Sequence, residues 1–242
     1  VQLTATGGTI YNWSSNPPGF VSNQDNPVVT PASTTTYTVT VNSTCGNATA
    51  SVTVTVHPLQ AVSLGAFSNV CIDAPAFILS GGTPSGGVYS GPGVSGGVFD
   101  PALAGAGLHT ITYTFTDANG CTNAATSSIR VNPLPVVSFF GLLPEYCITD
   151  PSSFLFGLPA GGTFSGPGIL PGDLFDPATA GIGTHTITYT YTDGNGCSNS
   201  MSHTLEVYPL PVISIIGLDA SYCITDAPAT IYGSEAPAGS FS

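Results

Sequence analysis

The sequence has 242 residues, and its 13 Asp and Glu face a single basic side chain, Arg130, so the formal net charge is −12. One arginine without any lysine cannot neutralise a phosphate backbone, which excludes nucleic-acid binding. The chain is 42% hydrophobic and only 6% charged, the reverse of a disordered composition, and it lacks the run of about 18 apolar residues that a membrane helix needs.

Alternation of apolar and hydroxyl residues predicts strands along the chain. The clearest runs are 36–41, 50–56, 110–116 and 186–192. In 110–116 the residues Ile111, Tyr113 and Phe115 would share one face of a sheet, while threonines occupy the other. Asn-Gly pairs follow two of these runs and favour tight hairpins. Because no helical stripe accompanies this pattern, we expect an all-β protein.

The chain repeats itself with a period of 76 residues. Two series of cysteines define this step, Cys71, Cys147 and Cys223 in one and Cys45, Cys121 and Cys197 in the other. Short strands and turns in units of this size predict one small β-sandwich per repeat. The predicted segments are a partial repeat without its first strand at 1–57, full repeats at 58–133 and 134–209, and a truncated repeat at 210–242. Both ends fall inside a repeat, so we expect a longer parent chain.

The junctions between repeats are short and rich in proline. They read Pro58-Leu59, Pro133-Leu134-Pro135 and Pro209-Leu210-Pro211. Proline fixes its own φ and biases the preceding residue toward extended conformations. Successive repeats should therefore be held within a limited range of angles, and we expect them to form an elongated, semi-rigid rod.

The even number of cysteines predicts a disulfide framework outside the cytosol. Pairing within each repeat would give Cys71–Cys121 and Cys147–Cys197, whereas pairing between successive repeats would give Cys71–Cys197. In a sandwich, the early and the hairpin cysteine of one repeat lie at opposite ends of a strand. A strand of eight residues spans roughly 26 Å, but bridged Cα atoms lie within about 7 Å. Both pairings remain open, and the candidates are Cys45, Cys71, Cys121, Cys147, Cys197 and Cys223.

No catalytic or cofactor-binding residues are predicted. Enzymes rarely tile one active site along a chain, so the histidines are interpreted as structural residues of strands and strand edges; they are His57, His109, His185 and His203. Asp100 and Asp176 each precede a proline, where an aspartate side chain usually caps a turn.

Two sets of aspartates are candidates for binding calcium, and one of them contains part of a calcium-loop pattern. Asp117 and Asp193 begin Asp-x-Asn-Gly turns, but the further acidic ligands of such a loop are lacking. Turn formation is therefore the preferred interpretation. Structural calcium held by Asp150 or Asp226 together with a neighbouring hairpin is the alternative.

Trp13 is the single tryptophan. An exposed indole would provide a stacking platform for sugars, whereas a buried one would belong to the core of a sandwich. Tyr89 and Phe164 are the corresponding aromatic residues in the alignment of the repeats, and they favour the core.

Several of these motifs resemble a known family. The stretches Gly-Gly-Thr-Phe-Ser-Gly-Pro-Gly at 161–168, the alternating run at 183–193 and Gly-Asn-Gly-Cys at 194–197 resemble tandem immunoglobulin-like or PKD-like repeats. Such repeats occur in large secreted cell-surface proteins of Bacteroidota, of the gliding-motility adhesin type. The resemblance covers essentially the whole chain and implies an immunoglobulin-like sandwich for each repeat and export to the cell surface.

These observations lead to a functional hypothesis. We expect a non-enzymatic shaft of an extracellular bacterial surface fibre or giant adhesin, which spaces a binding tip from the cell and bears load. Its expected partners are neighbouring repeats of the same chain, with other fibres or surface glycans as further candidates. The alternatives are a carbohydrate-binding repeat array attached to a secreted enzyme and the protomer of a polymerised extracellular filament.

Overall fold

A computed structural model describes residues 1–216, 221, 223–230 and 232–233. The chain divides into two compact units. The first contains Val1–Asn69 and Pro75–Arg130, and the second contains Val70–Ala74 and Val131–Ser242. The short segment Val70–Ala74 thus belongs to a unit whose remaining residues come much later in the sequence.

The first unit begins with a four-stranded sheet in the order β2-β1-β3-β4. Its strands are β1 (Ile10–Asn16), β2 (Val21–Ser22), β3 (Thr35–Ser43) and β4 (Gly46–Val54). Alternate residues of β3 are buried, as the sequence pattern predicts, and three of them, Tyr37, Val39 and Val41, join Trp13 in the core of this part. Strand β4 forms the edge of the sheet, and nearly all of its residues are exposed.

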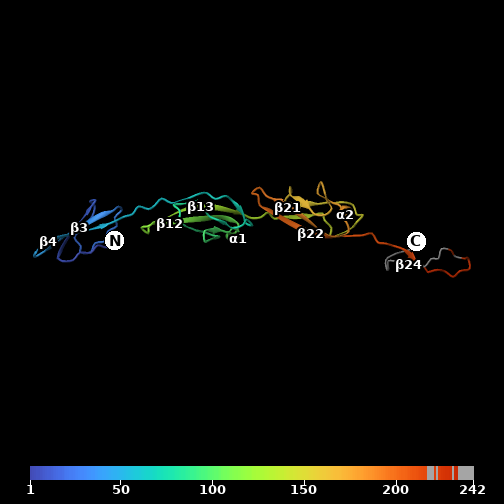
Figure 1. Cartoon of the computed structure of the whole chain (residues 1–242), viewed down its shortest axis with the longest axis horizontal. Helices are drawn as coiled ribbons and strands as arrows, with labels where there is room; N and C mark the ends of the chain where they lie inside the picture. Colours follow the sequence, from blue (N-terminus) through green and yellow to red (C-terminus); the bar gives the residue numbers. More distant parts are fainter. Residues whose placement is uncertain (217–220, 222, 231, 234–242) are drawn as a thin grey trace. The chain divides into compact units, whose positions relative to one another are not determined.

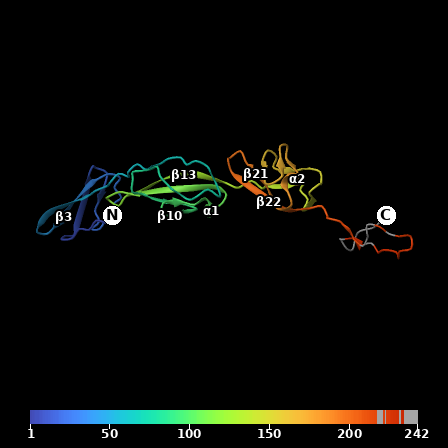
Figure 2. The same ribbon diagram turned by 45° about the vertical axis from the view of Figure 1, so that its right-hand side comes forward.

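The rest of the first unit is a sandwich built around the β12–β13 hairpin, whose strands run side by side in Figures 1 and 2. Its elements are β5 (Ser63–Leu64), β7 (Phe77–Ile78), β8 (Gly82–Thr83), β9 (Val88–Ser90), β10 (Val94–Ser95), β11 (Val98–Phe99), α1 (Pro101–Ala104), β12 (Gly107–Thr116) and β13 (Thr122–Asn132). The final residues of β13 belong to the second unit. There they pair in parallel with β6 (Val70–Cys71).

The second unit repeats this plan. Its main sheet has the order β15-β22-β21-β18, and smaller sheets β14-β17 and β16-β20-β19 complete it. The elements are β14 (Ser138–Phe140), β15 (Glu145–Cys147), β16 (Ser153–Phe154), β17 (Phe156–Leu158), β18 (Thr163–Ser165), β19 (Ile169–Leu170), β20 (Leu174–Phe175), α2 (Pro177–Ala180), β21 (Gly183–Thr192), β22 (Ser198–Tyr208), β23 (Ile215–Ile216) and β24 (Tyr232–Gly233).

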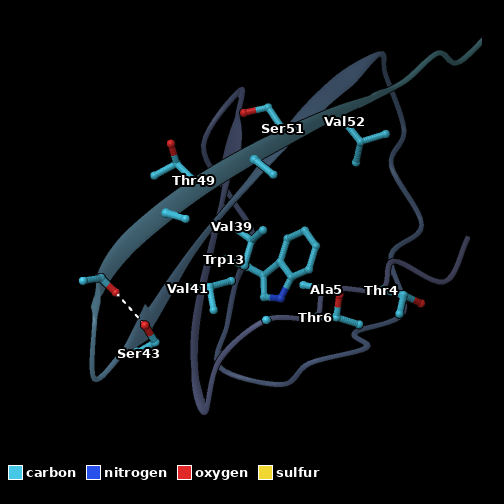
Figure 3. Close-up of a pocket in the computed structure, with 14 residues that line it drawn as sticks. Thr4, Ala5, Thr6, Trp13, Val39, Val41, Ser43, Thr49, Ser51 and Val52 are labelled. Carbon is cyan, nitrogen blue, oxygen red and sulfur yellow. Dashed lines mark hydrogen bonds between the residues drawn. The ribbon is translucent and has the colours of Figure 1, made fainter.

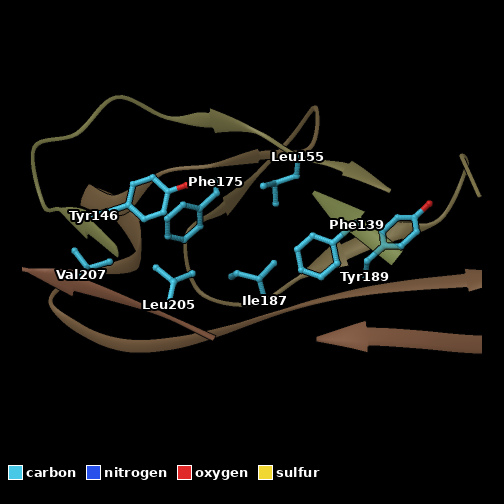
Figure 4. Packing of buried hydrophobic residues seen from close by; sticks show 8 residues of the cluster. All are labelled: Phe139, Tyr146, Leu155, Phe175, Ile187, Tyr189, Leu205 and Val207. Carbon is cyan, nitrogen blue, oxygen red and sulfur yellow. The ribbon is translucent and has the colours of Figure 1, made fainter. Parts of the chain in front are cut away.

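The core of the second unit lies between facing sheets. Figure 4 shows Ile187 and Leu205 on the β21–β22 hairpin with their side chains directed toward Phe175 on β20. All three are at most 2% exposed. Burial of aromatic and branched aliphatic side chains removes them from water and stabilises the sandwich. The predicted all-β, immunoglobulin-like sandwich class is confirmed, while the four segment boundaries remain a prediction.

One tyrosine per sandwich anchors a loop to the hairpin. The hydroxyl of Tyr113 donates to the carbonyl of Pro84 and accepts from the N–H of Gly87. Tyr189, 76 residues later, makes the same two contacts with its own loop. A Cβ at Gly87 would lie 2.5 Å from the Tyr113 ring, so this close approach requires glycine.

The helices α1 and α2 have four residues each. The sequence shows no helical periodicity because such short turns have no second turn in which to repeat a pattern. In the part of the chain that the structure describes, no helix has the length and apolar character needed to cross a membrane.

Candidate functional site

Two histidines stabilise the loops that follow the short helices. His109 and His185 each place Nε2 2.8 Å from a backbone oxygen four residues earlier, at Gly105 and Gly181. These contacts lie at equivalent places in the two sandwiches. They support the structural role that the sequence predicts for both histidines.

The other two histidines lie elsewhere. His203 packs against Phe139 with ring centroids 4.4 Å apart, and His57 is exposed in a loop. Within the described ranges, no three His, Cys, Asp or Glu side chains come close enough together to hold a metal ion.

Asp100 and Asp176 cap the two helices, as predicted. Asp100 Oδ1 accepts hydrogen bonds from the N–H groups of Ala102 and Leu103, and Asp176 Oδ2 accepts one from the N–H of Thr179 at 2.9 Å. The Thr179 hydroxyl also donates to Asp176 and holds the pKa of that carboxyl below its ordinary value of 3.8. Capping satisfies N–H groups that have no partner inside the helix.

Asp117 and Asp193 organise the hairpin turns. Each Oδ1 accepts from the N–H of the cysteine four residues later, Cys121 or Cys197, at 2.9 Å. These backbone hydrogen bonds keep the pKa of both carboxyls below 3.8, because they favour the charged form. The preferred interpretation as turn residues is thus supported by hydrogen bonds that occupy both carboxylates.

Two of the early cysteines, Cys147 and Cys223, also lie in turns capped by an aspartate. Asp150 Oδ2 accepts a hydrogen bond from the N–H of Cys147 at 2.7 Å, and Asp226 accepts the corresponding bond from Cys223. The two aspartates proposed as calcium ligands therefore already bond their own turns.

One disulfide joins the two series of cysteines. Cys71, at the end of β6, is bonded to Cys197, just before β22, with the Cα atoms 5.6 Å apart and a sequence separation of 126. Cys197 is 1% exposed. The other four cysteines are free thiols. The bond lies within the second unit and connects the segment Val70–Ala74 to the β21–β22 hairpin.

Pairing within a repeat, the first of the two predicted pairings, is wrong for this structure. Cys71 lies opposite Asn132, the last residue of β13, whereas Cys121 immediately precedes the first residue, Thr122. The 11 residues of β13 extend over roughly 35 Å, and a disulfide requires Cα atoms within about 7 Å. The same separation along β22 keeps Cys147 from Cys197.

An asparagine two residues after each hairpin cysteine was not identified from the sequence. Asn123 donates through Nδ2 to the carbonyl of Gln60 at 2.9 Å, and Asn199 donates to that of Pro135 at the same distance. Both acceptors lie in the proline-rich segments that open the predicted repeats. The signal that could have revealed them is the recurrence of Cys-x-Asn at a spacing of 76 residues.

A hollow in the first unit lies beside Trp13 and has a volume of about 420 Å³. Figure 3 shows the indole beside Val39 and Ala5, with the hydroxyl residues Thr49 and Ser51 on the strand above. Trp13 is only 5% exposed, and its Nε1 donates to the carbonyl of Gln24. The indole therefore belongs to the core, as the second interpretation predicted.

The predicted equivalence of Trp13 with Tyr89 is wrong in register. Trp13 lies opposite Val39 on β3, whereas Tyr89 lies opposite Tyr113, the counterpart of Tyr37. Phe164 lies opposite Tyr189 and so matches Tyr89. Compared with β9 and β18, strand β1 is thus displaced by two residues along its partner strand. A shift of two residues leaves the same side chains facing inward, because side chains alternate between the two faces of a strand with period two.

No protein-family model matches the sequence, and no curated protein matches it. Among solved structures, the chain is similar to a Ca²⁺-stabilised adhesin that helps an Antarctic bacterium reach out and bind ice, with 13% identity and a TM-score of 0.34 over 90% of this chain and 72% of that one. A 1.5-MDa bacterial ice-binding adhesin has 12% identity and a TM-score of 0.31, covering 84% of this chain and 86% of that one. Mouse protocadherin-24 EC1–3 has 11% identity and a TM-score of 0.29, covering 86% and 92%.

Proposed function

We propose that this chain is part of the structural shaft of an extracellular bacterial surface fibre or adhesin, where it spaces a binding region from the cell and bears tension without catalysing a reaction. The observation that carries the proposal is the disulfide Cys71–Cys197, which joins residues of two successive predicted repeats. Oxidised cysteines of this kind are typical of proteins outside the cytosol.

The disulfide provides a covalent path for tension. When force is applied to the two ends of the chain, it passes through the bond and bypasses the 125 residues between Cys71 and Cys197. The hairpin β12–β13 and the strand β21 lie within this bypassed stretch. The hydrogen bonds between β12 and β13 therefore join two strands outside the load path, which suits a shaft that must stay folded under tension.

Electron microscopy of the native material tests the shaft. We expect single-file fibres with beads spaced by one 76-residue repeat. Compact particles would contradict the proposal, and a helical lattice with strands exchanged between subunits would favour the polymerised filament.

A carbohydrate-binding array is the second candidate, because the hollow beside Trp13 is lined by the indole and by the hydroxyl residues Thr4 and Thr6. Titration of the chain with soluble polysaccharides and oligosaccharides tests this candidate. Binding measured by calorimetry that is lost in Thr4→Val with Thr6→Val, while the fold is retained, would support this candidate, and the absence of any heat of binding would contradict it.

A further inference from the structure

The free cysteine Cys147 lies in the same backbone setting as the bonded Cys71. Cys71 pairs with Asn132 and Cys147 pairs with Tyr208, in both cases in parallel with the end of a hairpin strand. The next N–H along the chain donates to that partner's carbonyl at 2.9 Å in both places. The turn that follows closes on the cysteine carbonyl at 3.1 Å and 3.0 Å, respectively.

The free cysteine Cys121 likewise matches the bonded Cys197. The N–H of each donates to the aspartate four residues earlier, Asp117 or Asp193, at 2.9 Å, and the carbonyl of each accepts from the aspartate N–H at 3.0 Å and 2.9 Å. Cys147 therefore has the backbone setting of Cys71, and Cys121 has that of Cys197, but neither of these two thiols is bonded to a second cysteine. Cys147 is exposed and Cys121 is partly exposed, so both are open to reaction.

The spacing explains why these halves are not joined to each other. The bonded pair is separated by 126 residues, which is one 76-residue period plus the 50 residues from early to hairpin cysteine. The same step forward from Cys147, or backward from Cys121, leads outside the 242 residues. Within a repeat, β22 holds Cys147 away from the hairpin, as described above.

We propose that Cys147 is the acceptor of a second disulfide, whose partner is the hairpin cysteine of the repeat that follows 134–209 in the same polypeptide. Cys121 is correspondingly the hairpin half of a bond to an early cysteine of a preceding repeat. Each bond forms when two thiols lose two protons and two electrons to a disulfide oxidant, such as a thiol–disulfide oxidoreductase, which becomes a dithiol. Successive repeats are then linked in a ladder. This inference rests on the settings of the cysteines and holds whether or not the chain bears load.

The test adds one repeat to the full chain. A copy of residues 134–209 is inserted after Pro209, the protein is oxidised with a mixture of reduced and oxidised glutathione, free thiols are alkylated and disulfides are mapped by mass spectrometry. We expect Cys147 to be joined to the hairpin cysteine of the inserted copy, with the same occupancy as Cys71–Cys197. Cys45 is the internal control, since it is exposed but its N–H contacts Ser43 Oγ instead of an aspartate, and it should be alkylated.

Folding is checked in the same sample by retention of Cys71–Cys197. A second version, in which serine replaces the hairpin cysteine of the inserted copy, should leave Cys147 alkylated and Cys71–Cys197 intact. Alkylation of Cys147 in the first version, or its pairing with Cys197, would overturn the proposal. Bonding of Cys45 to the inserted hairpin would also overturn it, because the setting would then not select the partner.

Discussion

The buried hydroxyl of Tyr189 and the partly exposed carboxylate of Asp193 have similar roles in different surroundings. Both bond backbone groups of loops that lack a strand partner. Loop N–H and carbonyl groups must be satisfied once water is excluded. Threonines and branched residues thus build the hairpin, while a few polar side chains determine how its ends and loops are held.

Replacing Tyr189 with phenylalanine should destabilise the second unit by about 1–3 kcal/mol, because the Gly162 N–H and the Pro159 carbonyl lose their partner in a half-buried loop. Urea-induced unfolding followed by circular dichroism measures the change. Tyr191→Phe is the matched control, since in the part of the chain described here the Tyr191 hydroxyl makes no hydrogen bond, and it should leave the midpoint nearly unchanged. Equal effects of the two substitutions would contradict the anchoring role.

Asp193 should make the stability of the second unit depend on pH. Its folded-state pKa is lowered below 3.8, chiefly by the Cys197 N–H, so the charged carboxylate contributes stability above the unfolded pKa and loses it as the pH falls through the folded pKa. We expect Asp193→Asn to lower the thermal midpoint at pH 7, and this difference from the native chain to shrink below about pH 3.8.

Asp173→Asn is the control for this titration, because among the described residues the Asp173 side chain makes no hydrogen bond and asparagine tolerates its positive φ of 58°. A difference between the native chain and Asp193→Asn that stays constant from pH 7 to pH 2 would show that the charge contributes nothing.

Among the elements, the long strands β13 and β22 control the disulfide chemistry. Each has 11 residues and places an early cysteine opposite its end and a hairpin cysteine before its start. Strand length therefore decides against pairing within a repeat, and the parallel pairing of β6 with β13 leaves Cys71 available to a later hairpin.

Cleavage at Arg130 should distinguish the two pairings directly. Trypsin has one cleavage site in this chain, after Arg130, and cutting the denatured, unreduced protein gives fragments 1–130 and 131–242. The bond Cys71–Cys197 crosses this site, so the fragments should stay together on a non-reducing gel and separate after reduction. Both bonds of the alternative pairing lie within single fragments, and separation without reduction would contradict the observed disulfide.

For the whole molecule, the disulfide changes which residues can be stretched. The bond encloses a loop of 126 residues, whose fully extended length is about 430 Å. The peptide segments outside the loop remain free to extend under force.

Single-molecule stretching should therefore show a contour length about 430 Å shorter under oxidising than under reducing conditions. The variant Cys71→Ser should give the longer value under both conditions. Cys45→Ser is the control and should behave as the native chain, because Cys45 is a free thiol. Equal lengths for the native chain with and without reductant would contradict a load path through Cys71–Cys197.

Much of the fold and the turn chemistry follows from local sequence. The alternating runs correspond to β3, β4, β12 and β21, and the aspartates before Pro101 and Pro177 cap turns as expected. The four-residue helices and the hydrogen bonds of Asn123 and Asn199 were not predicted. A helix of one turn leaves no periodic signal, and the contact of an asparagine with a carbonyl more than 60 residues away leaves no local one.

By itself, the sequence determined the β class, the 76-residue period and the two cysteine series, because each of these depends on residue type and on spacing along the chain. Only the tertiary structure decided which cysteines pair, that the indole of Trp13 is buried, and that its strand is shifted by two residues. These outcomes depend on distances between segments that are remote in sequence. Such distances arise from strand length and sheet register, to which short sequence motifs are insensitive.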